Sequence, residues 1–301
     1  MRILHIDTGV EMRGGQHQVL LLLNALREAG HESLLLANSK GLLWEAARSD
    51  GFPVFAAEAK QAWQQSRTAA IVHAHDARAH TMAAIASRRK FVVSRRVAFP
   101  VRRSLASVWK YQRAARFLAV SQFVAGELQT AGIRAEKIDV VYDGVGVNTS
   151  AEPWSAAYPA VALSSTDPEK GRGLVEQAAS IAGIPVVFSD DLVEDLRRAS
   201  MFVYITRSEG LGSAALVAMS MGVPVIGSKV GGMTEVFADA VSGVLVENEP
   251  SSIASAMRRI LDDSAFAHGL IEHAKSRVEE RFSKRHLLEG TLASYGRALG
   301  A

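Results

Sequence analysis

The stretch MFVYITRSEGLGSAALVAMSMGVPVIG, residues 201–227, decides the fold class of this chain. It opens with a short apolar run at Met201–Ile205, typical of a buried strand, and closes with another at Pro224–Gly227. Between them, Ala214–Met221 has the composition and length of a helix, and glycines punctuate the loop before it. Strand, helix and strand in this order predict a parallel sheet with helices on its faces.

The same alternation continues on both sides of this stretch. Helical patterns such as Val19–Leu26, closed by Gly30, separate the apolar runs. The predicted strands are Arg2–Asp7, Ser33–Ala37, Ala70–His75, Phe91–Arg95, Phe117–Ser121 and Ile138–Tyr142, then Ala160–Ser164, Pro185–Phe188, Met201–Ile205, Pro224–Gly227 and Gly243–Val246. Two such series predict an α/β fold of two doubly wound, Rossmann-like domains with a cleft between them, and helices alone from Ser251 onward.

The break between the two series falls in Gly144–Tyr158, where Asn148 and Pro153 interrupt the periodicity. We expect residues 1–147 to form an N-terminal domain and residues 148–283 a C-terminal domain. The last helix, residues 284–301, is expected to pack back on the N-terminal domain. A chain of 301 residues is long enough for two such domains.

Composition excludes several classes of function. Apolar residues make up 48% of the chain and charged residues 22%, values of a globular rather than a disordered protein. The absence of cysteine excludes disulfide scaffolds, thiolate nucleophiles and cysteine-ligated metals. His5, Asp7 and Glu11 break the apolar run that a signal peptide needs, and no apolar stretch is long enough to span a bilayer. We therefore expect a cytoplasmic protein.

Loops that follow strands are the expected ligand sites, because open α/β sheets bind ligands beyond the carboxyl ends of their strands. Thr8–Gly15 ends in Gly14-Gly15, which fits equally well a tight turn or a close approach to phosphate. His73 and His75 alternate onto one strand face, but a third metal ligand is not evident, so we predict no metal.

Residues 77–126 contain no Asp or Glu. Their basic residues are Arg78, Arg88, Arg89, Lys90, Arg95, Arg96, Arg102, Arg103, Lys110, Arg113 and Arg116. This composition fits a solvated basic face, or an anionic partner such as phosphate or anionic lipid. Nothing resembles a groove-reading motif, so we expect no nucleic acid.

Three loops of the second half suggest a nucleotide sugar. Asp167–Gly171 places Lys170 at the start of a helix, where it suits a diphosphate or is simply a solvated turn lysine. Ser208–Ser213 exposes backbone amides beside the carboxylate of Glu209, which is costly near an anion unless it binds hydroxyls. Gly231–Glu235 adds another glycine-rich turn. Phosphate together with hydroxyls describes a nucleotide sugar.

At these residues the chain resembles the retaining glycosyltransferases of family 4, which have the two-Rossmann GT-B fold. The matching runs include GGQHQVLLLLNALREAGHE, AIVHAHD, DPEKG and RSEGLGSAALVAMSMGVPVIGSKVGGMTEVFADAVSGVLV. The resemblance implies a metal-independent hexosyltransferase-like enzyme without a cofactor. The N-terminal domain of this fold receives the acceptor, so the basic segment 77–126 favours an acceptor that is phosphate-bearing or lipid-linked. By analogy with the family we expect a role in envelope polysaccharide or lipopolysaccharide synthesis, and a peripheral place on the inner face of the plasma membrane.

The resemblance also implies residue roles. Lys170 would bind the donor phosphates and Glu209 would hold sugar hydroxyls; together with Arg96 they would be the catalytic residues. A histidine common in the family is replaced by Arg95-Arg96, which would bind a phosphate instead. The donor-binding residues would be Gly14, Gly15, Gly210, Leu211, Gly212 and Ser213. The acceptor or phosphate patch would comprise His75, Arg95, Arg102 and Arg103.

Three departures from the family pattern keep a second class of function open. The family's second glutamate, which clamps the ribose, is replaced by Val217, and the arginine before the DPEKG-type lysine by Ser165. The stretch between Ile184 and Met201 is shortened. Losing the hydrogen bonds of the glutamate costs about 1.5–3 kcal/mol, or one to two powers of ten in affinity. The alternative is a catalytically degenerate relative that binds a ligand or partner without turnover; an epimerase explains the basic segment less well.

Overall fold

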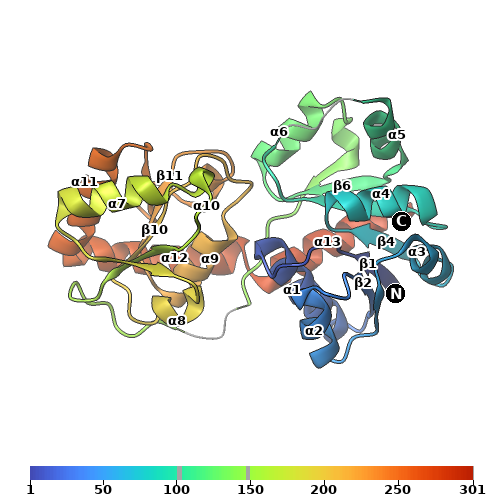
Figure 1. Cartoon of the computed structure of the whole chain (residues 1–301), viewed down its shortest axis with the longest axis horizontal. Coiled ribbons are helices and arrows are strands. Elements are labelled where there is room, and N and C mark those ends of the chain that lie inside the picture. The colour runs from blue at the N-terminus through green and yellow to red at the C-terminus, as the bar shows by residue number, and fades with distance from the viewer. Residues whose placement is uncertain (100–103, 147–149, 301) are drawn as a thin grey trace. The chain divides into compact units, whose positions relative to one another are not determined.

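The computed structural model of the chain describes residues 1–99, 104–146 and 150–300, which divide into two compact units (Figure 1). The first unit comprises Met1–Gly144 together with Lys284–Ala301, and the second comprises Val145–Ser283. The division falls after Gly144; the sequence analysis set it after residue 147, which lies outside the described residues.

The first unit contains a seven-stranded parallel sheet. Its strands are β1 (Arg2–Ile6), β2 (Glu32–Ala37), β3 (Val54–Ala56), β4 (Ile71–Ala74), β5 (Phe91–Arg95), β6 (Arg116–Ala119) and β7 (Ile138–Val140). Its helices are α1 (Gly14–Glu28), α2 (Leu42–Ser49), α3 (Ala59–Ser66), α4 (Ala77–Ala86), α5 (Leu105–Arg113), α6 (Gln122–Thr130), the 3-10 turn η1 (Ala135–Lys137) and α13 (Lys284–Leu299). The strand order is β3-β2-β1-β4-β5-β6-β7, so the chain reverses its direction of winding between β1 and β4.

Helices cover both faces of this sheet. Neighbouring residues of a strand point to opposite sides, so one strand contacts helices on both faces. Leu118 of β6 packs with Leu287 and Tyr295 of α13. Its neighbour Phe117 instead stacks on Tyr111 of α5, with ring centroids 5.3 Å apart. The C-terminal helix α13 therefore supplies part of the core of the first unit, beside α1 (Figure 1).

The second unit contains a five-stranded parallel sheet. Its strands are β8 (Ala160–Leu163), β9 (Val186–Ser189), β10 (Met201–Tyr204), β11 (Val225–Ser228) and β12 (Val244–Val246). Its helices are η2 (Pro168–Lys170, a 3-10 turn), α7 (Arg172–Ala182), α8 (Leu192–Leu196), α9 (Ser213–Met221), α10 (Met233–Val236), α11 (Pro250–Asp262) and α12 (Ser264–Arg281). The order β12-β11-β10-β8-β9 reverses between β8 and β10, which are hydrogen-bonded neighbours.

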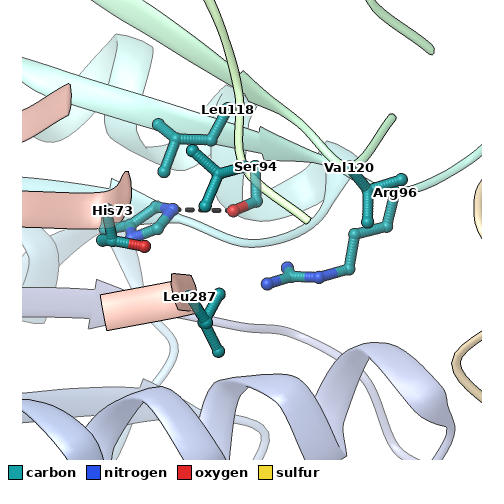
Figure 2. A pocket seen from close by; sticks show the side chains of 8 residues that line it. His73, Ser94, Arg96, Leu118, Val120 and Leu287 are labelled. Carbon is teal, nitrogen blue, oxygen red and sulfur yellow. Dashed lines mark hydrogen bonds between the residues drawn. The ribbon is translucent and has the colours of Figure 1, made fainter. Parts of the chain in front are cut away.

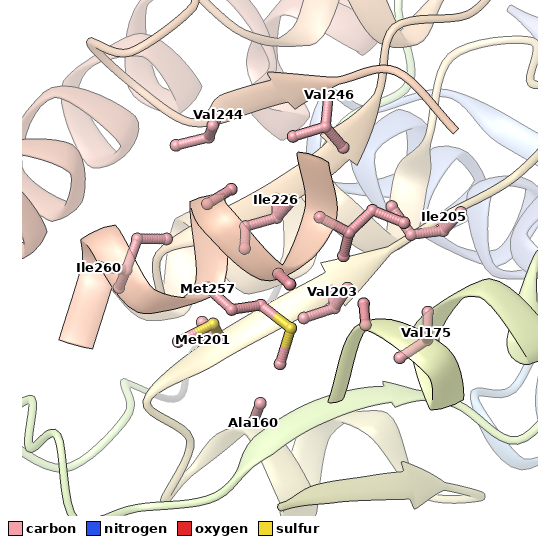
Figure 3. Packing of buried hydrophobic residues seen from close by; sticks show 14 of the residues in the cluster. Ala160, Val175, Met201, Val203, Ile205, Ile226, Val244, Val246, Met257 and Ile260 are labelled. Carbon is pink, nitrogen blue, oxygen red and sulfur yellow. The ribbon is translucent and has the colours of Figure 1, made fainter. Parts of the chain in front are cut away.

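The core of the second unit lies between its sheet and the helices α7 and α11. Figure 3 shows Met257 of α11 beside Met201 and Val203 of β10, with Val175 of α7 nearby. These side chains are almost fully buried. Burial of this kind stabilises by about 1.5–3 kcal/mol for each large apolar side chain. It fixes β10, whose end positions the loop described below.

The predicted fold class is confirmed: the chain is α/β, with two doubly wound parallel sheets followed by helices. Every predicted strand is present, with its ends within two residues of the prediction. The strand β3 was not predicted; it is only three residues long and half-buried throughout. Among the described residues, no helix is both long and apolar enough to cross a membrane.

Candidate functional site

The first candidate site lies where the second sheet reverses its strand order. Lys170 ends the turn η2 that follows β8, and Glu209 lies in the loop that follows β10. Lys170 Nζ is 3.1 Å from Glu209 Oε2. Ligands of open α/β sheets bind beyond the carboxyl ends of the strands at such a reversal. The structure therefore brings together the two side chains that the sequence singled out in this half.

Tyr204 holds the carboxylate of Glu209 in place. The hydroxyl of Tyr204, at the end of β10, donates to Glu209 Oε2 at 2.5 Å, and the Gly210 amide donates to Oε1 at 3.1 Å. Burial and the adjacent charge of Glu209 raise the pKa of Tyr204 well above its usual value. The phenol therefore stays protonated and remains a donor to the carboxylate. Sequence reasoning missed Tyr204, because it read the residue only as part of an apolar strand.

The turn that carries Lys170 is fixed by the backbone around it. The carboxylate of Asp167 caps it by accepting from the Glu169 amide at 3.0 Å. Gly171 has φ +64°, and a Cβ there would lie 2.9 Å from the carbonyl oxygen of Ile205. The carbonyl of Glu169 accepts from the Arg207 amide at 2.8 Å. The loops after β8 and β10 are thus joined directly to each other.

A glycine-rich turn after β11 braces the same site. The Gly232 amide donates to the Glu209 carbonyl at 3.0 Å. A Cβ at Gly232 would lie only 1.9 Å from the carbonyl oxygen of Gly210, so only glycine fits there. Gly212, with φ +110°, leads directly into α9, which begins at Ser213. The positive end of the α9 dipole therefore lies beside Gly210, Leu211 and Gly212.

This arrangement combines three kinds of group. Lys170 supplies an ammonium, α9 supplies the start of a helix, and Glu209 supplies a carboxylate whose oxygens have acceptor capacity beyond the bonds described. Ammonium groups and helix starts bind phosphate, whereas carboxylates bind hydroxyls. A phosphate-bearing sugar would satisfy both.

A second candidate site lies where the sheet of the first unit reverses, between β1 and β4. The carboxylate of Asp7 accepts from the Gly9 amide at 2.9 Å and from Gln16 Nε2 at 3.0 Å, which shapes the loop before α1. Asp76, the N-cap of α4, accepts from the Thr8 hydroxyl at 2.9 Å. Burial raises the pKa of Asp7. Neither Asp7 nor Gln16 was singled out by the sequence.

Arg96 points into this second site. Its Nε donates to Asp143 Oδ1 at 3.0 Å, and both side chains are largely buried. A Cβ at Gly15 would lie 4.0 Å from Arg96 Cδ, an ordinary contact distance, so Gly15 leaves open space beside the arginine. Gly14 is the first residue of α1 and lies at the same turn.

Arg96 also lines a cavity of about 10 Å³, roughly the space of one water molecule (Figure 2). His73, Ser94 and Thr291 line it too. Arg96 Nη1 and Thr291 Oγ1 are buried and have no hydrogen-bond partner in the described part of the chain. The guanidinium thus retains donor capacity that Asp143 does not use.

A cluster of three buried histidines lies under the second site. The structure adds His5, on β1, to His73 and His75; their candidate ligand nitrogens lie within 4.8 Å of one another. The reason given for predicting no metal, a missing third ligand, was therefore wrong, because pairing of β1 with β4 supplies it. Burial lowers the pKa of all three, that of His5 to about 3, so they are neutral near pH 7.

Hydrogen bonds satisfy only part of the cluster, because His5 Nε2 and His75 Nδ1 are buried without a partner among the described residues. His5 Nδ1 and His75 Nε2 share a hydrogen bond at 3.0 Å. His73 uses both ring nitrogens: one bonds to the Tyr295 hydroxyl at 2.7 Å. The other bonds to the Ser94 hydroxyl at 2.8 Å (Figure 2). A metal would have to displace at least one of these contacts. That the protein binds no metal stays a prediction.

The residues predicted as one phosphate patch do not all gather. His75 lies near Arg96, whose charge contributes to lowering the histidine's pKa. Arg95 belongs to the other face of the sheet, where its charge acts on Lys110 and Tyr111. Arg102 and Arg103 lie outside the described residues.

The basic segment 77–126 is less unpaired than its composition indicates. Arg116 makes two hydrogen bonds with Asp139, at 2.5 and 2.7 Å, and Arg96 pairs with Asp143. Both acids lie beyond the segment, on or after the neighbouring strand β7. Charge pairing across a sheet cannot be inferred from a count within one segment.

Two consecutive, fully parallel, doubly wound sheets, each with polar loops at its reversal, define the GT-B class of proteins. A model described as Glycosyltransferase Family 4 matches residues 12–149, and one described as Glycosyl transferases group 1 matches residues 182–277. Together the matches take in most of the chain. The chain belongs to glycosyltransferase family 4.

Curated relatives match over part of their length. The D-inositol 3-phosphate glycosyltransferase of Acidothermus cellulolyticus is 34% identical over 142 residues, which are 45% of this chain and 31% of the relative. The protein of the same name from Nocardioides sp. is 30% identical over 185 residues, 60% of this chain and 37% of the relative. The matched stretches thus span about a third of these relatives.

Solved structures match over nearly the whole chain. Anabaena Alr3699/HepE in complex with UDP-glucose has a TM-score of 0.84 at 18% identity, covering 98% of this chain and 100% of that one. The lipopolysaccharide outer core galactosyltransferase WaaB has a TM-score of 0.72 at 15% identity, covering 98% and 99%. At these identities the likeness shows the fold.

Proposed function

We propose that this protein is a metal-independent glycosyltransferase that moves a sugar, with retention, from a nucleotide-linked donor to a phosphate-bearing or lipid-linked acceptor. The observation that carries the proposal is the contact between Lys170 and Glu209 at the reversal of the second sheet. It supports a donor site because it joins a phosphate-binding group to a hydroxyl-binding group at the start of α9.

The chemistry of the step requires stabilisation of a leaving diphosphate. In this proposal Lys170 and the start of α9 face the charge that develops on the diphosphate oxygens, and Glu209 holds hydroxyls of the sugar. Tyr204 and the Gly210 amide keep Glu209 oriented without neutralising it. A UDP-glucose complex of a structure with the same fold supports a nucleotide-sugar donor.

The acceptor is assigned to the first unit. Arg96 combines a buried guanidinium with open space over Gly15, which suits a phosphate that approaches the start of α1. The name D-inositol 3-phosphate glycosyltransferase, printed for the matched relatives, supports an acceptor bearing phosphate. The name of WaaB, a lipopolysaccharide outer core galactosyltransferase, supports a role in envelope or lipopolysaccharide assembly. We also propose that the enzyme meets such an acceptor at the inner face of the plasma membrane.

Val217 favours a second candidate, a relative that binds a ligand without turnover. Val217 lies on α9 and offers no side-chain acceptor for a ribose diol. Ser165 likewise lacks a charge, but Arg172 stands close by, since its Nη1 donates to the Ser164 carbonyl at 3.4 Å. A cation is therefore present at this loop, which favours the transferase.

Calorimetry with uridine, guanosine, adenosine and thymidine diphosphates separates the two candidates when it is followed by a transfer assay with the matching nucleotide sugar. If the protein is a transferase, at least one nucleoside diphosphate must bind, and the same diphosphate must be released from the matching nucleotide sugar during the transfer assay. Binding without release over long incubation with a panel of phosphorylated acceptors would favour the degenerate relative. No binding of any nucleotide would leave the proposed donor site without a ligand.

A further inference from the structure

Helix α5, Leu105–Arg113, presents apolar side chains to solvent. None of its side chains is buried. Leu105 is 91% exposed, and Val108 and Trp109 are each 45% exposed. Residues three and four positions apart lie on one side of a helix, so these three form a single stripe. We call this stripe the α5 face.

The opposite side of α5 faces the protein, and it carries the charged Lys110 and the aromatic Tyr111. Lys110 Nζ donates to the Thr81 hydroxyl at 3.2 Å, and its backbone carbonyl bonds to His80 Nε2 at 3.2 Å. Tyr111 stacks on Phe117 of the sheet. A surface helix normally turns its apolar stripe to the core and its charges to water. In α5 three apolar side chains instead face solvent while Lys110 faces the protein, so packing within the unit does not explain the α5 face.

The segment before α5 has the same character. Val97 and Phe99 are exposed, and Arg95 Nη2 donates to the carbonyl of Phe99. Arg95 also acts electrostatically on Lys110 and Tyr111, which places its charge near α5. Single exposed apolar residues are ordinary, but contiguous ones mark an interaction surface.

The positive charge around the α5 face indicates which kind of partner binds there. Arg113 lies at the end of α5 with its guanidinium 5.4 Å from the Trp109 ring centre, and residues 77–126 contain no acid. A second copy of this chain would bring two basic surfaces together without compensating acids from this segment. An anionic lipid surface offers acyl chains to Leu105 and Val108, an interfacial position to Trp109, and phosphates to Arg113.

We propose that the α5 face docks the protein on an anionic lipid surface, with Leu105, Val108 and Trp109 in the interfacial region and Arg113 at the headgroups. Nine residues bury little area, so the interaction is reversible and depends on both apolar contact and charge. The inference rests on the proposed function in one respect: an enzyme with a lipid-linked acceptor meets it at such a surface.

Vesicle co-sedimentation, without donor or acceptor, tests the inference separately from the transferase. We expect the protein to bind vesicles of phosphatidylcholine mixed with phosphatidylglycerol, and to bind pure phosphatidylcholine at least about tenfold more weakly. The double variant Leu105→Ser/Trp109→Ser should lose about tenfold or more of the binding. The matched control Leu42→Ser/Trp63→Ser removes an exposed leucine and an exposed tryptophan elsewhere in the same unit and should bind as the parent does.

A charge arm completes the experiment. Arg113→Gln should weaken binding to the mixed vesicles about fivefold at low salt, whereas Arg48→Gln, at an exposed helix end elsewhere, should not. The inference is overturned if the parent ignores mixed vesicles, if it binds neutral vesicles equally, or if the double variant binds like its control. It is also overturned if the parent is a dimer that the double variant dissociates, because the α5 face then belongs to a second copy. Nucleotide binding is unaffected by these outcomes, so each proposal can fail alone.

Discussion

Lys170 and Glu209 meet 3.1 Å apart across the reversal of the second sheet, with their side chains 32% and 17% exposed. Neither charge is buried deeply enough to make this pair a major source of fold stability. A charged ligand can compete for both groups, because each remains accessible to solvent. The pair therefore fits a binding role better than a structural one, and the first prediction follows from it.

Replacement of either member of the pair should reduce transfer strongly. We expect Lys170→Ala and Glu209→Ala each to lower the transfer rate by about two powers of ten or more, because each removes charge or hydrogen bonding at the reacting end of the donor. Steady-state assays with the nucleotide sugar identified by calorimetry measure the effect. Lys284→Ala, which breaks the exposed pair with Glu28 in the first unit, is the matched control and should stay at the parental rate. Parental activity in both site variants would show that the donor site lies elsewhere.

Restoring the family's ribose clamp should tighten nucleotide binding. We expect Val217→Glu to increase affinity for the nucleoside diphosphate by about one to two powers of ten, because a carboxylate can accept from both ribose hydroxyls. Val217→Gln serves as the control for side-chain length and should gain less. Titration calorimetry with the diphosphate and its 2′-deoxy analogue isolates the ribose contribution. Equal gains for the two nucleotides would refute a ribose contact at this position.

Gly232→Ala should damage the loops that hold Glu209. The added Cβ would lie 1.9 Å from the Gly210 carbonyl oxygen, so the backbone must shift, at a cost of about 1–3 kcal/mol in the free energy of unfolding. Gly173→Ala is the control: a Cβ in α7 meets nothing within 4 Å, and the change should stabilise by roughly 0.5–1 kcal/mol. Urea unfolding measures both. A harmless Gly232→Ala would contradict the close approach of these loops.

The buried histidines make the first unit sensitive to acid. Burial, aided by the charge of Lys110, lowers the pKa of His80 from 6.5 to about 3. In the unfolded chain His80 binds a proton below about pH 6.5, whereas in the folded chain it stays neutral down to about pH 3. The free energy of unfolding therefore falls as the pH drops through this window. Each such histidine contributes a slope of about 1.4 kcal/mol per pH unit.

His80→Phe tests this dependence in the aromatic cluster of Phe91, Tyr111 and Phe117. Urea unfolding between pH 7 and pH 5 should show a slope smaller than the parental one by about one proton. Gly173→Ala, which changes no titratable group, is the control and should leave the slope as it is. If His80→Phe kept the parental slope, His80 would bind its proton equally well in the folded and unfolded chain, and the predicted lowering of its pKa would be refuted.

Local patterns predicted most of the fold. Apolar runs such as Phe91–Arg95 define strands because a parallel strand is covered on both faces, and Phe117 and Leu118 show this directly by packing to opposite sides. The strand β3 could not be predicted, because three half-buried residues show no apolar periodicity. The strand orders, and with them the two reversals, are non-local and cannot be inferred from one segment at a time.

The candidate sites were predicted where one loop carries the signal, as at Lys170 and Glu209. They were missed where two distant segments meet. Tyr204 lies in an apolar strand, and only the fold brings its hydroxyl to Glu209. His5 likewise meets His75 only through the pairing of β1 with β4. Arg95 and Arg96 were grouped by adjacency, yet alternation along the strand directs them to opposite faces.

The return of α13 to the first unit has a consequence for biosynthesis. Leu287 and Tyr295 belong to the core that surrounds β5 and β6, and Tyr295 also bonds to His73. A ribosome releases these residues only after it has made the entire second unit. Domains otherwise fold in the order in which they emerge during synthesis. Here the first unit cannot complete its core until α13 is made, although the second unit can fold before then. Nascent chains stalled before residue 284 therefore expose part of the first unit's apolar core and should be substrates for chaperones.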